Sequence, residues 1–232
     1  MAFGVIFSSF FSALGQIGDP RFRKVLGLGI LLTFVLLIAV YAAFLWFLQA
    51  ALGESSTVPV LGEVTWINDL ATFASLFFML ILSVFLMVPV ASAITSMFLD
   101  EVANAVEDKH YRHLPPANKV PFGEAFKDTV NFLGVLIAAN ILAFILYAVF
   151  APLAVFIFWG LNGFLLGREY FTLAAIRRVG RVEAKKLRRK HIGTIWLAGT
   201  FMAIPLSIPL MNLAIPILGA ATFTHIYHKL VR

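Results

Sequence analysis

Lysine and arginine are distributed very unevenly along this 232-residue chain. None of its 18 Lys and Arg residues lies between residues 25 and 108, a window that holds two long apolar runs joined by a loop with acidic charges only. Cytoplasmic loops of membrane proteins are enriched in Lys and Arg. The asymmetry therefore predicts that the chain crosses a bilayer at residues 25–52 and returns at residues 70–99, with both termini in the cytoplasm.

The composition supports an integral membrane protein. Hydrophobic residues make up 61% of the chain and charged residues 13%, whereas a soluble domain is close to half apolar and about a quarter charged. A water-soluble enzyme is thereby excluded. The net charge of +6 needs no nucleic-acid partner, because anionic lipid headgroups attract basic residues at the ends of membrane segments. The absence of cysteine excludes disulfides and thiolate metal sites.

Residues 1–18 carry apolar side chains at helical spacing, with serines and a glutamine largely between them. We expect a helix that lies along the cytoplasmic interface. The apolar residues are Phe3, Phe7, Phe10, Phe11, Leu14 and Ile17.

The first two apolar runs are long enough to span a bilayer, since a spanning helix needs about 20 apolar residues. We expect spanning helices over residues 20–52 and 66–108, the second continuing as a helix into the cytoplasm. The third run, residues 129–167, is broken at Ala151-Pro152, and proline interrupts helical hydrogen bonding. A single crossing there would place the basic segment 168–190 outside, against the positive-inside bias. This run is therefore predicted to be a hairpin over residues 122–176.

The fourth run, between Lys190 and Lys229, has three prolines near its centre. Each of its arms is short of a full span, so we expect a re-entrant helical hairpin over residues 191–228, with its turn buried in protein or lining a wet cavity. For the third run two full crossings also remain open. The predicted fold is one all-α membrane domain over residues 1–232. It has two long transmembrane helices, two re-entrant (hemi-penetrating) helical hairpins and the N-terminal interfacial helix.

A cationic cluster opens the first spanning helix. Asp19 is a good N-cap and Pro20 a good first helical residue, and the amino end of a helix favours anions. Arg21, Arg23 and Lys24 therefore form a candidate oxyanion site. The alternative is that the three cations are membrane anchors that contact lipid phosphates.

Other polar residues at membrane depth are candidates for a permeation path or a structural role. Asn162 lies on the same apolar helix as the adjacent charges Arg168 and Glu169, and such charges usually pair within the protein. Asn212 lies in a proline-bracketed turn, where broken helices commonly build solute sites. It could equally satisfy only the backbone of its own turn.

No catalytic set or cofactor site emerges from the sequence, so we do not expect an enzyme. The four carboxylates of residues 100–108 are explained by a solvated helix end, and the basic stretch 177–190 by a solvated helix on anionic headgroups. The two histidine pairs, at residues 110 and 113 and at residues 225 and 228, make incomplete metal sites, and no metal is predicted.

The chain resembles the CysZ-type sulfate permeases, which share a domain with eukaryotic etoposide-induced membrane proteins. Residues 21–24 are similar to the family's Gly-apolar-Arg-Arg anion motif, residues 208–216 to its proline-bracketed turn with a central Asn, and residues 162–171 to a block in one subgroup. The resemblance implies two spanning helices and two hemi-penetrating hairpins in a homo-oligomer, with Arg23 and Lys24 as anion ligands. Arg21 stands where the family has glycine, and Lys24 lacks the bidentate fork of the family's second arginine.

The function that this resemblance implies is sulfate uptake across a bacterial inner membrane, which supplies sulfur for cysteine synthesis. The expected partners are sulfate, membrane lipids and further copies of the chain. A channel and a proton-coupled permease both remain open, and Glu101, Glu169 or a histidine could carry the protons. The alternatives are a non-transporting membrane scaffold and a permease for sulfite or thiosulfate.

Overall fold

The computed structural model of the chain describes residues 2–52, 56–58, 62–64, 77, 98–118, 122–208 and 211–231. The predicted second crossing at residues 70–99 lies almost wholly outside these ranges. The described elements are α1 (Ala2–Leu14), α2 (Pro20–Leu52), β1 (Ser56–Val58), β2 (Gly62–Val64), α4 (Leu99–His110), α5 (Phe122–Val149), the 3-10 turn η1 (Ala151–Leu153), α6 (Ala154–Lys190), α7 (Ile192–Ala203), the 3-10 turn η2 (Ile204–Ser207) and α8 (Met211–Val231). Apart from the small antiparallel pair β1–β2, the described fold is helical, as predicted.

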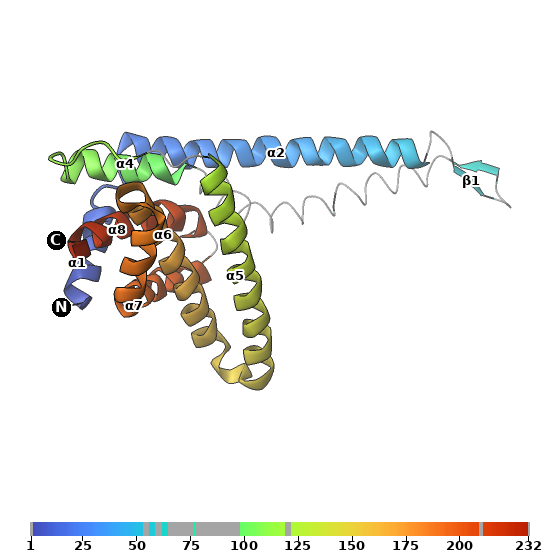
Figure 1. The fold of residues 1–232 in the computed structure, drawn as a ribbon. Helices are drawn as coiled ribbons and strands as arrows, with labels where there is room; N and C mark the ends of the chain where they lie inside the picture. Colours follow the sequence, from blue (N-terminus) through green and yellow to red (C-terminus); the bar gives the residue numbers. More distant parts are fainter. Residues whose placement is uncertain are drawn as a thin grey trace.

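Helix α8 lies at the centre of the fold, packed against α1, α4 and α6 (Figure 1). Every residue from Ile215 to His228 is buried. A helix that is apolar on all sides needs neighbours on all sides, and α8 obtains them from segments far away in the sequence. Helix α8, which contains the second arm of the predicted hairpin 191–228, is therefore the central buried helix of the protein.

Helix α1 turns its small and polar residues inward. Ser9 and Ala13 are fully buried, whereas Phe3, Phe7 and Phe11 remain exposed as a stripe along the outer face. Small side chains allow helices to approach closely, and α1 packs on α8 through this side. The side of α1 that carries Ser9 therefore faces protein, and the aromatic side stays largely exposed apart from Phe7, whose ring lies 5.4 Å from that of Phe201 on α7.

Helix α2 extends far beyond the other helices (Figure 1). Phe22 and Val25 at its start are buried, but large side chains further along, such as Leu31, Ile38 and Trp46, are exposed. Within the described part of the chain, two segments are long and apolar enough to cross a membrane: Pro20–Phe44 and Ala151–Lys190. The first confirms the first predicted spanning helix in length and composition.

The second candidate span contains the return arm of the hairpin formed by α5, η1 and α6. The helix breaks at Ala151-Pro152 as predicted, because α5 ends at Val149 and η1 carries the proline. The return arm is longer than expected and runs on to Gly180, where φ of 73° reverses the chain inside α6. Figure 1 shows that this hairpin and α2 point in clearly different directions.

Glycines bring α6 and α7 into backbone contact. A Cβ built on Gly199 of α7 would overlap the carbonyl oxygen of Gly163 and lie 2.8 Å from the amide nitrogen of Gly167, both on α6. The Gly163–Gly167 spacing is the small-xxx-small pattern that lets helices pack closely in membranes. The segment after Gly180 therefore folds back so that α7 lies against the first half of α6.

Candidate functional site

The start of α2 has the predicted cap. Asp19 Oδ1 accepts a hydrogen bond of 2.9 Å from the backbone N–H of Arg21, and Asp19 Oδ2 accepts one of 3.1 Å from Gln16 Nε2. Burial by itself would raise the pKa of the Asp19 carboxyl, but these two bonds and the charge of Arg21 lower it. The carboxylate is thus ionised and satisfies a free amide at the amino end of the helix.

Arg21 is committed to an ion pair. Its Nη1 lies 2.7 Å from Asp108 Oδ2, at the end of α4, and both side chains are partly exposed. The pair therefore ties the start of α2 to the end of α4, and Arg21 is not free to act as an anion ligand alone.

A polar recess of about 500 Å³ lies between these two helix ends. Its charged lining consists of Asp19, Arg21, Asp108, Lys109 and Arg112. Gln16 closes the floor and donates from Nε2 to the Ala105 carbonyl oxygen at 3.0 Å. Three cations and two carboxylates give the recess a net positive charge, which suits an anion.

The other two predicted sulfate ligands lie outside this recess. The side chains of Arg23 and Lys24 are exposed and have no hydrogen-bond or ion-pair partner among the residues that the structure describes. The structure thus divides the predicted site: Arg21 lines the recess with an acidic partner, and Arg23 and Lys24 project from α2 uncommitted.

A buried ionic cluster, which sequence reasoning missed, joins α4, α6 and α8. The side chain of Glu107 is 7% exposed and forms a bidentate ion pair with Arg178. Nε of Arg178 lies 2.9 Å from Oε1, and Nη2 lies 2.6 Å from Oε2. Arg177 lies 3.6 Å from Oε2, and His228 Nε2 donates to Oε1 at 3.0 Å. We call Glu107, Arg177, Arg178 and His228 the Glu107 cluster.

The electrostatics of this cluster keep Glu107 ionised. Burial alone would raise the pKa of its carboxyl, but the hydrogen bonds from His228 and Arg178 and the charges of both arginines lower it to about 2. Arg177 also donates to the Asp100 carbonyl oxygen at 3.2 Å and to Asn104. Glu107 and the start of the basic stretch are therefore interior, and the prediction of solvated helix ends is wrong for them.

Next to the cluster, aromatic rings stack between α4 and α8. The Tyr111 hydroxyl and His225 Nδ1 are 2.9 Å apart, and the rings of Tyr111 and His228 stack with centroids 4.1 Å apart. Burial, followed by the charges of His110, Lys229 and His228, lowers the pKa of His225 to about 3. Within the described ranges no three His, Asp, Glu or Cys side chains come close enough to hold a metal ion.

The remaining predicted residues are scattered. Glu101 is exposed on α4. Asn162 donates to the Phe158 carbonyl oxygen of its own helix at 2.9 Å. Arg168 and Glu169 lie half-buried on α6, and neither forms a hydrogen bond or ion pair with another described residue. Asn212 falls in the first turn of α8, and its side chain lies outside the described part of the structure.

The position of Glu107 in α4 held a usable signal. It lies one turn after Ala103 and next to Val106, both fully buried, so helical periodicity places it on the inner face. A carboxylate on such a face requires basic partners, and the sequence offers the adjacent pair Arg177 and Arg178. Only the fold shows that this pair lies opposite Glu107.

Comparison with known proteins identifies the family. Searches of curated proteins and of solved structures find no match. A family model described as "Sulfate transporter CysZ/Etoposide-induced protein 2.4" matches residues 9–216, nearly the whole chain. The chain belongs to this family, as the resemblance in its motifs indicated.

Proposed function

We propose that the protein takes up sulfate across a bacterial inner membrane and so supplies sulfur for cysteine synthesis. The observation that carries the proposal is the start of α2, where the side chains of Arg23 and Lys24 are exposed without a partner among the described residues beside a positively charged recess. Backbone N–H groups and the helix dipole at such an end favour an anion. The membership in a sulfate transporter family supports sulfate as that anion.

The proposed topology places both termini in the cytoplasm and the recess at the cytoplasmic end of the pathway. In this arrangement α2 and residues 66–108 form the two spanning helices, and the hairpins α5–α6 and α7–α8 enter the membrane partway. The different directions of α2 and the α5–α6 hairpin support partial insertion (Figure 1). The exposed phenylalanines of α1 suit a helix at the interface, and a homo-oligomer would complete the conducting path.

The membrane potential limits the mechanism. Uptake of a divalent anion against an inside-negative potential costs about 4.6 kcal/mol per 100 mV. A passive channel therefore requires abundant external sulfate or rapid internal consumption, and accumulation requires coupling to protons. Among the proposed proton carriers Glu169 is half-buried on α6 without a bonded partner in the described structure, whereas Glu101 is exposed. Glu169 is thus the better candidate.

Flux of labelled sulfate into liposomes tests the proposal. The Arg23→Ala/Lys24→Ala variant should lose most of the flux, whereas the matched control Lys185→Ala/Arg189→Ala, which also removes one exposed lysine and one exposed arginine, should keep it. An imposed proton gradient that accelerates uptake would favour symport over a channel.

The same assay separates the alternatives. Folded protein that gives no flux above empty liposomes would overturn transport and favour a membrane scaffold. Flux of sulfite or thiosulfate that exceeds that of sulfate, with the same dependence on Arg23 and Lys24, would make the protein a permease for a related oxyanion.

A further inference from the structure

An apolar groove of about 640 Å³ lies between α5 and the α6–α7 pair. Its described lining consists of apolar side chains, among them Ala139, Leu142, Leu161, Phe164 and Ile192. The polar side-chain group in this described lining is the indole N–H of Trp196. It already has a partner, because Trp196 Nε1 donates to the Gly160 carbonyl oxygen at 2.8 Å. The groove therefore offers nothing to a small hydrated ion and suits a hydrocarbon chain.

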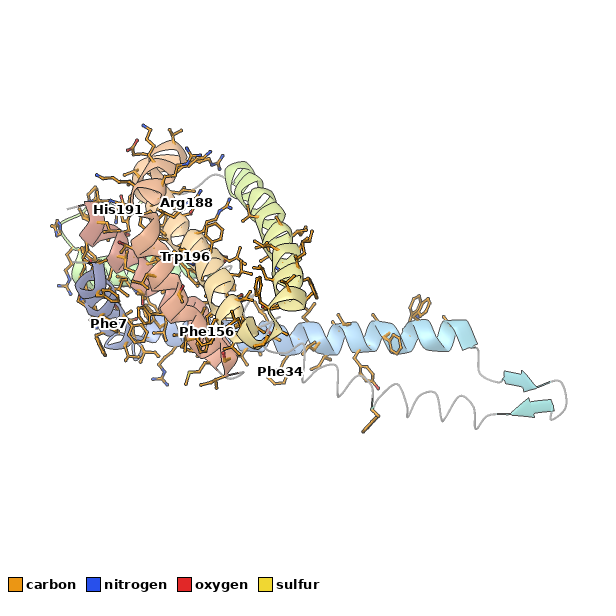
Figure 2. All side chains as sticks on the ribbon, turned by 90° about the horizontal axis from the view of Figure 1, so that it is seen from below. Phe7, Phe34, Phe156, Arg188, His191 and Trp196 are labelled. Atoms are coloured by element: carbon orange, nitrogen blue, oxygen red, sulfur yellow. The ribbon has the colours of Figure 1, made fainter. Side chains whose placement is uncertain are left out.

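Two arginines lie beyond one end of this groove. Leu161, Phe164 and Arg168 follow one another along one face of α6, so Arg168 lies one turn beyond the apolar lining. Arg188, on the segment that folds back after Gly180, donates from Nη1 to Thr172 Oγ1 at 2.9 Å, one turn beyond Arg168. In Figure 2 the labelled Arg188, Trp196 and Phe156 follow one another from this basic end towards the α5–α6 tip.

The charges of these two arginines are not compensated within the described structure. Both side chains are half-buried. Neither has a carboxylate partner among the residues that the structure describes. Half-buried cations normally pair with an anion, and no carboxylate of the described side chains supplies one here.

Groove and arginines together define the chemistry of the missing ligand. A phosphate diester bound by two guanidinium groups fulfils the ionic requirement, and a fatty acyl chain attached to it fills the apolar groove. A free sulfate would satisfy the arginines and leave the groove unexplained. We propose that the α5–α6–α7 groove is a binding site for an anionic phospholipid, with its phosphate on Arg168 and Arg188 and one acyl chain between α5 and the α6–α7 pair.

Native mass spectrometry of the full chain tests this site with two chain-matched lipids, phosphatidylglycerol and phosphatidylcholine. The wild type should retain phosphatidylglycerol selectively. The Arg168→Gln/Arg188→Gln variant should bind it about 30-fold more weakly, since each basic group contributes about a fivefold attraction at an anionic surface. The matched control Lys185→Gln/Arg189→Gln changes two exposed basic residues of the same segment and should bind as the wild type does.

Binding of the acyl chain in the groove is tested separately. Ala139→Phe narrows the groove without changing charge and should also weaken retention of phosphatidylglycerol. In a variant with Trp46, Trp66 and Trp159 changed to Phe, the remaining Trp196 should be quenched by phosphatidylglycerol brominated on its acyl chain. This readout needs no change to the arginines, so it remains valid if the arginine variant does not fold.

Two results would overturn the site. One is equal retention of both lipids by the wild type, with no quenching of Trp196. The other is displacement of phosphatidylglycerol by millimolar sulfate, with an effect of Arg168→Gln/Arg188→Gln and none of Ala139→Phe, which would assign the arginines to the transported ion.

Discussion

Helices α8 and α2 are both strongly apolar and yet have opposite surroundings. In α8 every residue from Ile215 to His228 is buried, and the polar groups it carries include His228 with its bond to Glu107. In α2 large side chains are mostly exposed, including Leu31 at 59% and Ile38 at 66%. Apolar composition alone therefore does not distinguish a helix covered by protein from one left for lipid. The polar groups and their partners make the distinction.

The strongest way to break this contrast is to remove the ionic partner of α8. Glu107→Ala removes the buried carboxylate that Arg177 and Arg178 share and should lower the free energy of unfolding by about 3–5 kcal/mol. Chemical unfolding in detergent measures this loss. Glu101→Ala on the exposed side of the same helix is the control and should change stability by less than about 0.5 kcal/mol. Equal losses in the two variants would show that the cluster contributes nothing specific.

The pH dependence of stability sharpens the same point. The pKa of Glu107 falls to about 2 on folding from an ordinary value of 4.5, so the unfolded chain binds more protons than the folded one in this range. The stabilisation is complete above about pH 4.5 and is lost as the pH falls towards 2, by about 3 kcal/mol in total. Unfolding of the wild type and of Glu107→Gln should be compared from pH 7 to 3. A variant that retains the full slope would assign it to other groups.

Lysine substitutions at exposed apolar positions report whether each position faces lipid or water. Leu31→Lys, near the middle of the first candidate span, should disfavour insertion by about 2.5–3.5 kcal/mol. Val182→Lys, at a position 72% exposed beside the basic residues after Gly180, should leave it unchanged. A glycosylation-based insertion assay in microsomes reports both. Similar behaviour of the two variants would mean that α2 is not covered by lipid.

The contact between α6 and α7 can be tested with two glycines of one helix. Gly199→Ala introduces a Cβ into the backbone of α6 and should cost about 1–3 kcal/mol of stability. Gly193→Ala meets open space and should be neutral or stabilising by up to about 1 kcal/mol. Thermal unfolding of both variants provides the comparison, and an equal response would contradict close packing of α6 on α7.

The smallest expected effect concerns the cap of α2. Asp19→Ala removes the acceptor for the Arg21 amide and should cost about 1 kcal/mol. Hydrogen exchange should show faster exchange of the first amides of α2, with no change in α8. Unchanged exchange would mean that water replaces the cap without loss.

Local features of the fold were predictable from the sequence, and long-range ones were not. The start of α2 at Asp19-Pro20 and the break at Ala151-Pro152 depend on backbone chemistry within a few residues, so the sequence indicates them directly. The bond between Arg178 and Glu107 spans 71 positions. Nothing in the neighbourhood of either residue identifies the other.

The candidate site shows the same division. The motif of residues 21–24 was visible in the sequence. The ion pair between Arg21 and Asp108, which are 87 positions apart, was not, and it separates the role of Arg21 from that of Arg23 and Lys24. The reversal at Gly180 was also missed, because the surrounding basic residues are typical of a continuous solvated helix. That reversal brings Arg188 to Thr172 and so creates the basic end of the groove.

The packing of α1 on α8 has a consequence for how the protein is made. Ser8 and Lys229 are 221 positions apart and are joined by a hydrogen bond of 2.8 Å. The ribosome therefore delivers α1 long before its partner, and α1 spends most of translation with Ser9 and Ala13 uncovered. Assembly of the buried helices is correspondingly a late event, which follows insertion of α2 and closes the fold only when α8 emerges.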